Sequence, residues 1–172
     1  MYDATDWTDE HAAALEDGLD RARLGTRIRA LAGQWRELLS RGEIVRAAPH
    51  AAERTWSILE HGCHVRAALE YTEQHLRLML KKRKPPKLRY WNQRDAAVDG
   101  KYGQQDPGKV AYALASTGGK VADLLDRIDD GDWQRTAVRL DGAEFTVERL
   151  ARYLVHDLEH HLDQAHQILD GR

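Results

Sequence analysis

The chain has 172 residues and a formal net charge of −2 at pH 7, and 42% of its residues are hydrophobic and 31% charged. This length suits one domain, and the apolar content is too high for a disordered chain, so we expect a single globular domain over residues 1–172. The small negative charge argues against general attraction to nucleic acid or to an anionic membrane. Cys63 is the single cysteine, which excludes an intrachain disulfide and a zinc site built from thiolates.

The start of the chain indicates where the protein resides. Residues 1–6 are acidic and lack the basic start and apolar stretch of a secretory signal. No later segment approaches the length of a membrane-spanning helix. We therefore expect a cytoplasmic protein without a membrane partner.

Helical spacing of apolar residues predicts a first helix over about residues 9–41 and a second over about 57–82. Gly18, Gly25 and Gly33 weaken the first, since a glycine costs about 1 kcal/mol relative to alanine inside a helix. The second has a well-marked beginning, because Ser57 followed by Glu60 has the spacing of a capping box.

Residues 81–107 then form a long connection with the pair Pro85-Pro86, several glycines and little periodicity, which is expected to be functional or mobile. A third helix is predicted over about residues 108–129 and a fourth over about 146–169, with Thr146 as its N-cap. We find no convincing alternating strand, so the expected fold is all-α, a four-helix bundle.

Residues 81–91 mix basic and aromatic side chains, a combination that can hold phosphate or stack on a base. Such a run is more often a solvated loop, and the overall charge argues against a nucleic-acid partner. The same loop can instead attract the carboxylates of an acidic thiol cofactor.

Five of the nine histidines fall in two clusters, one on the second predicted helix and one on the fourth. His156 and His160 are four residues apart, so they lie one above the other on a helix and can bind the same ion. His64, on the other helix, is the candidate third ligand, since bundle sites are built from facing helices. Three protein ligands would leave positions open for water or substrate.

The spacing alone also permits histidines without a metal. Leu154 and His156 are about 200° apart on a helical wheel, so the histidine pair does not share the main apolar stripe and can face water. Against that, Tyr153, Asp157 and Gln164 extend the pair into a polar and aromatic stripe of the kind that lines pockets. Glu60 and Asp157 are candidates to receive a ligand's second ring N–H, or are an ordinary cap and a surface charge.

A resemblance covers nearly the whole chain. Residues 56–64, Trp-Ser-Ile-Leu-Glu-His-Gly-Cys-His, resemble the W-S-x-x-E-x-x-x-H signature of the DinB-like (DinB/YfiT-like) superfamily of metal-binding bundles. Residues 156–161, His-Asp-Leu-Glu-His-His, resemble the family's H-x-x-x-H motif on the last helix. The resemblance implies a four-helix bundle, often a homodimer, with zinc, nickel or iron held by His64, His156 and His160. It leaves His61 and His161 as pocket or supporting residues.

The family also implies chemistry. Characterised relatives include mycothiol-dependent maleylpyruvate isomerase and bacillithiol S-transferases, so the expected function is a metal-dependent enzyme that uses a low-molecular-weight thiol, such as mycothiol, in S-transfer to or isomerisation of a small electrophile. A sulfoxide synthase is disfavoured, because Leu162 replaces the glutamate of that motif. The alternative is a non-enzymatic, stress-related metal-binding bundle that dimerises. No catalytic base is identified.

Overall fold

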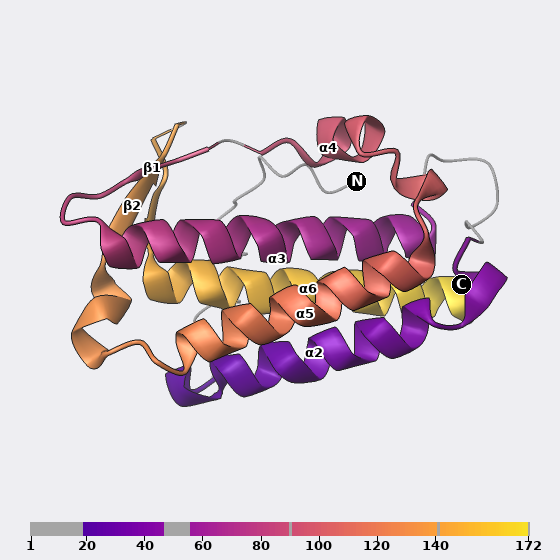
Figure 1. The fold of residues 1–172 in the computed structure, drawn as a ribbon, viewed down its shortest axis with the longest axis horizontal. Helices are drawn as coiled ribbons and strands as arrows, with labels where there is room; N and C mark the ends of the chain where they lie inside the picture. Colours follow the sequence, from indigo (N-terminus) through magenta and orange to yellow (C-terminus); the bar gives the residue numbers. More distant parts are fainter. Residues whose placement is uncertain (1–18, 47–55, 90, 141, 172) are drawn as a thin grey trace.

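The computed structural model describes residues 19–46, 56–89, 91–140 and 142–171, and Figure 1 shows its long helices side by side with a small sheet at one end. The bundle consists of α2 (Leu24–Leu39), α3 (Ile58–Lys81), α5 (Pro107–Leu125) and α6 (Val147–Leu169). The shorter elements are α4 (Gln93–Asp99), β1 (Lys87–Leu88), β2 (Thr136–Arg139), β3 (Glu144–Thr146) and the 3-10 turns η1 (Arg21–Arg23), η2 (Gly42–Arg46), η3 (Tyr102–Gln104) and η4 (Asp130–Gln134). The predicted four-helix bundle is confirmed, while residues 9–18 of the first predicted helix lie outside the described residues.

The starts of the two helices that carry the histidine clusters are fixed by local hydrogen bonds. The Glu60 amide donates to Ser57 Oγ at 3.3 Å and the Ser57 amide donates to Glu60 Oε2 at 2.7 Å, so the predicted capping box is present. At α6 the Arg149 amide donates to Thr146 Oγ1 at 3.0 Å, as predicted for an N-cap. Glu60 is therefore a cap, one of its two expected roles.

The helices are not arranged around the bundle in chain order. α2 packs mainly on α5 and less on α6, while α3 packs on both α5 and α6, so α2 and α3 lie diagonally. Gly118 explains the close approach of α5 to α2, because a Cβ at that position would lie 2.7 Å from Ala32 Cβ. Gly25 has the same role at the start of α2, where a Cβ would lie 3.0 Å from the Ala122 carbonyl oxygen. Gly25, a weak point of the predicted helix, is thus a packing residue.

A three-stranded sheet, in the order β1-β2-β3, covers one end of the bundle. β1 pairs in parallel with β2, and β2 pairs antiparallel with β3, with Ala137 opposite Phe145. Our expectation of no strand was wrong, because strands of two to four residues are too short to show an alternating pattern. None of the helices in the described ranges is long and apolar enough to cross a membrane.

Candidate metal centre

Helices α3 and α6 bring two imidazoles and one carboxylate together in the interior of the bundle. His64 on α3 is fully buried, and Asp157 and His161 on α6 are each 7% exposed. His64 Nε2 lies 3.2 Å from Asp157 Oδ2, and His161 Nε2 lies 3.5 Å from Asp157 Oδ1. Each residue offers one potential ligand atom, and these three atoms lie within 4.8 Å of one another. Within the described ranges, this is the one group of histidine, cysteine or acidic residues that meets that spacing.

The apolar stripe of α6 explains why this face points inward. Asp157 follows the buried Leu154 by three residues and His161 follows the buried Leu158 by three, so both polar side chains lie about 60° from that stripe. They are four residues apart and stack on one side of the helix. The family motif assigned the ligand roles to His156 and His160 and left Asp157 and His161 as supporting residues.

The predicted partners of His64 lie beside this group. His156 and His160 are half-buried, and their rings stack on each other with centroids 6.3 Å apart. The His160 ring also contacts the His161 ring, at a centroid distance of 5.3 Å. The structure thus brings His64 together with Asp157 and His161, and the ligand set His64, His156 and His160 stays a prediction.

The electrostatics of the buried group favour a cation. Burial alone would raise the pKa of Asp157, but attraction to His64 and hydrogen bonding with His161 outweigh it and hold that pKa well below its usual range. Burial, and then the neighbouring His64, lower the pKa of His161. At neutral pH the group therefore combines a carboxylate anion with a neutral His161, which are the protonation states that metal ligands need.

The donor set fits a divalent metal ion. His64 Nδ1 is buried and has no hydrogen-bond partner among the described residues. Two imidazole nitrogens and a carboxylate oxygen are ligands that zinc, nickel and ferrous iron accept. Three such ligands would leave coordination positions open.

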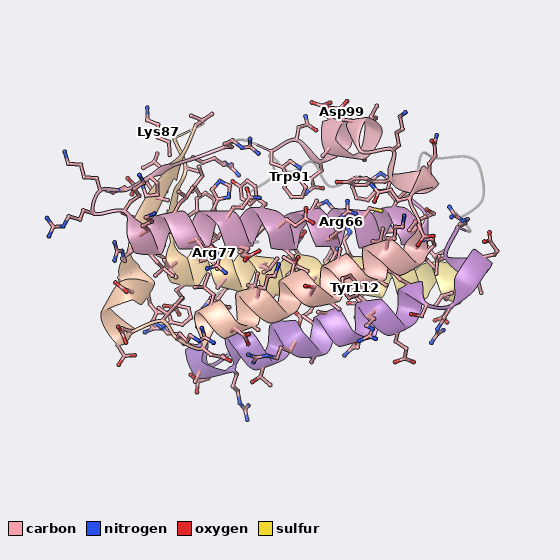
Figure 2. All side chains as sticks on the ribbon, viewed as in Figure 1. Arg66, Arg77, Lys87, Trp91, Asp99 and Tyr112 are labelled. Atoms are coloured by element: carbon pink, nitrogen blue, oxygen red, sulfur yellow. The ribbon has the colours of Figure 1, made fainter. Side chains whose placement is uncertain are left out.

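Aromatic rings and a third histidine enclose the group. His61 Nδ1 lies 2.9 Å from His161 Nδ1, so one of the two nitrogens carries the proton and donates to the other. Burial, with help from His161 and His64, lowers the pKa of His61 to about 3. Trp91, which lies over α3 in Figure 2, stacks on His64 at 5.2 Å between ring centroids, and the Trp56 ring lies 5.4 Å from His64.

A pocket of about 50 Å³ opens next to the group, and Asp157 belongs to both. Its walls come from α3, the segment from β1 to the start of α4, the β2–β3 hairpin and α6. The polar and aromatic wall residues include Tyr71, Thr72, Trp91, Arg139, Phe145 and Tyr153. The centre is therefore adjacent to a space that can receive part of a small molecule.

Two further residues with ionisable side chains are buried on α3. His75 is 3% exposed, and its Nδ1 lies 2.6 Å from the Tyr71 carbonyl oxygen. Cys63 is buried, and burial raises the pKa of its thiol to about 11. A thiol with this pKa is poorly suited to act as a nucleophile or a ligand.

Comparisons with known proteins bear on the family and the fold. A family model described as the DinB superfamily matches residues 31–165. Among solved structures, YfiT from Bacillus subtilis, described as a probable metal-dependent hydrolase with an unusual four-helix bundle topology, matches with a TM-score of 0.77 at 14% identity, over 89% of each chain. No curated protein matches the sequence. At this identity the structural likeness shows the fold.

Proposed function

This chain belongs to the DinB superfamily, and from that premise we propose that it is a metal-dependent enzyme acting on a small molecule, with the ion held by His64, Asp157 and His161. The observation that carries the proposal is the buried group itself, whose ligand atoms lie within 4.8 Å of one another. The adjoining pocket, which Asp157 also lines, supports an enzyme over a purely structural site, because it gives a small molecule access to the group.

The chain's own residues supply orientation and enclosure. Asp157 lies within reach of both imidazoles, and the Nδ1–Nδ1 contact with His61 orients the His161 ring. Trp56 and Trp91 cover His64 and limit access of water. A divalent ion in this position supplies Lewis acidity and lowers the pKa of a thiol or water that it binds.

We infer that the reaction uses a low-molecular-weight thiol, such as mycothiol, in S-transfer to or isomerisation of a small electrophile. The family resemblance supports this chemistry. Hydrolysis is the second candidate, since YfiT is described as a probable metal-dependent hydrolase. Both reactions need the same centre, so the two are distinguished by the substrate assay.

The ligand set is tested first. Untagged protein is purified and its zinc, nickel and iron content and its zinc affinity are measured for the wild type and for five single alanine variants, at His64, Asp157, His161, His156 and His160. We expect loss of binding for the first three and retention for the last two. Loss at His156 and His160 with retention at Asp157 and His161 would instead support the ligand set predicted from the sequence.

Catalysis is tested with the metal-loaded wild type, using His64→Ala as the control. Consumption of mycothiol, bacillithiol and glutathione is followed with a chlorinated aromatic electrophile, and ester and amide hydrolysis is followed in parallel. We expect metal-dependent thiol consumption that the variant lacks. Tight metal binding without turnover in either panel would favour a non-enzymatic, dimerising metal-binding bundle.

A further inference from the structure

A row of aromatic rings leads along α3 to His64. The Trp91 ring lies parallel to the His64 imidazole, with 4° between the planes and 5.2 Å between the centroids. Tyr71 stacks on the same indole at 5.7 Å and 21°, and the His75 ring lies 3.9 Å from the Tyr71 ring. His64, Tyr71 and His75 are spaced by seven and then four residues, so they share one face of α3, over which Trp91 lies in Figure 2.

The far end of the row is fastened to the main chain of Arg89, two residues before Trp91. The Tyr71 hydroxyl donates to the Arg89 carbonyl oxygen at 2.8 Å. His75 Nδ1 lies 2.6 Å from the Tyr71 carbonyl oxygen, which can only accept, so Nδ1 carries the proton. His75 Nε2 is then an acceptor, and the Arg89 amide donates to it at 3.4 Å. Two side chains of α3 therefore hold both polar groups of the Arg89 main chain.

The contact of His75 with the Arg89 amide requires an uncharged imidazole. His75 is 3% exposed, and this burial lowers its pKa, an effect to which the positive charge of Arg89 adds. At pH 7 the ring is therefore neutral, and Nε2 accepts the hydrogen bond.

The chain around Trp91 is firmly anchored on one side only. Leu88, which precedes it, is 1% exposed and is paired with β2 through the sheet. The helix that follows it, α4, buries none of its residues. The Arg89 contacts extend the anchor at Leu88 towards Trp91, so the position of the indole depends on Tyr71 and His75.

A ring stacked on the face of an imidazole fixes its plane without covering its nitrogens, whose lone pairs lie in that plane. His64 Nε2 lies 3.2 Å from Asp157 Oδ2, and His64 Nδ1 has no hydrogen-bond partner among the described residues. Rotation of the imidazole would change the direction of both nitrogens relative to Asp157 and His161. A plane that is fixed before an ion arrives lowers the ordering cost of binding it.

We propose that Tyr71 and His75 are positioning residues of the metal centre, which act through Trp91 to fix the plane of the His64 imidazole. The ion in this scheme rests on the proposed function, whereas the orientation of His64 is a property of the metal-free protein. Tyr71 and Trp91 also line the pocket. A small molecule that enters the pocket therefore contacts the rings that orient His64.

The first experiment uses the full chain in its metal-free form. Nuclear magnetic resonance signals of the His64 ring, assigned with His64→Ala, are compared between the wild type and four variants: Trp91→Leu, Tyr71→Phe, His75→Leu and His75→Gln. We expect Trp91→Leu to remove the ring-current shift of the His64 signals, and Tyr71→Phe and His75→Leu to reduce it. Glutamine keeps an acceptor near the position of Nε2, so His75→Gln should restore most of the wild-type shift.

The second experiment measures zinc affinity by competition with a chelator, alongside urea unfolding of each variant. Trp91→Leu should weaken zinc binding about tenfold, at the lower end of the effect of residues that support metal ligands. Tyr71→Phe, which keeps the ring but loses the bond to Arg89, should weaken it about fivefold, the factor that one hydrogen bond provides. Tyr102→Phe is the matched control, because Tyr102 is also buried but its ring contacts Trp56 instead of His64, and its zinc affinity should equal that of the wild type.

Identical His64 signals in the wild type and Trp91→Leu would overturn the proposal. So would an equal effect of Tyr71→Phe and Tyr102→Phe on zinc affinity, or a His75→Gln variant that behaves as His75→Leu. A lower urea midpoint without a change in zinc affinity would assign the row a structural role only. Tyr71→Phe decides the question if a leucine variant does not fold. Zinc retained by His64→Ala contradicts the proposed centre, whereas unchanged His64 signals contradict the positioning, so the two failures are distinct.

Discussion

Acid should destabilise the metal-free protein, and His61 should account for a measurable part of the loss. The pKa of His61 is about 3 in the folded protein, against 6.5 for a free histidine. Between these two values the unfolded chain binds a proton that the folded protein does not, so the free energy of unfolding falls as the pH decreases. The contribution is complete above pH 6.5 and decreases progressively towards pH 3.

The magnitude follows from the two pKa values. One pKa unit corresponds to about 1.4 kcal/mol, and this histidine alone should reduce the free energy of unfolding by about 2 kcal/mol between pH 7 and pH 5. With a denaturant slope of about 2 kcal/mol per molar urea, the unfolding midpoint falls by roughly 1 M from this source. His75, His160 and His161, whose pKa values are also lowered, add to the total.

Urea unfolding of the wild type and of His61→Gln, in the presence of a chelator at both pH values, isolates the contribution of His61. Glutamine keeps a hydrogen-bonding side chain next to His161 but does not titrate. The variant should lose about 2 kcal/mol less than the wild type on acidification, while His166→Gln, at an exposed position, should behave as the wild type does. An equal loss in His61→Gln and wild type would refute the reasoning.

Three further predictions concern stability. Gly119→Ala should raise the free energy of unfolding by about 1 kcal/mol, because nothing lies within 4 Å of the new Cβ. Gly118→Ala should be less stable than Gly119→Ala by about 1–3 kcal/mol, because its Cβ meets Ala32. Urea titration of both variants measures the difference. Ser57→Ala, which removes one half of the capping box with Glu60, should cost about 1 kcal/mol by the same assay, and an unchanged midpoint would contradict the cap. Zinc at a hundred times its dissociation constant should stabilise the wild type by about 2.7 kcal/mol and raise its melting temperature, with no rise in a variant that does not bind the ion.

Much of the fold could be predicted from the sequence, because its signals are local. Ser57 and Thr146 mark helix starts by satisfying backbone amides within one turn, and both caps are present in the structure. The spacing of leucines identifies the helices themselves. The three short strands could not be found this way, since two to four residues show no alternating pattern and β1 pairs with a strand much later in the chain.

The candidate group shares one residue with the ligand set predicted from the sequence. His64 lies in the buried group, but α6 offers two pairs at the same spacing, His156 with His160 and Asp157 with His161, which differ by about 100° of helix rotation. Histidine is the more familiar ligand, so residue type favoured the first pair. The buried Leu154 and Leu158 lie about 60° from the second pair on the helix, so the packing of α6 turns Asp157 and His161 inward.

The sequence by itself determined the all-helical class, the helix starts and the two helices that carry the candidate ligands, because backbone hydrogen bonds and apolar periodicity act over a few residues. Only the tertiary structure decided which side of α6 faces α3, that α2 and α3 lie diagonally, and that Arg139 reaches a pocket beside Asp157. These features depend on how helices pack over long separations in the chain. Packing selects one rotation and one neighbour among several that the same local pattern allows.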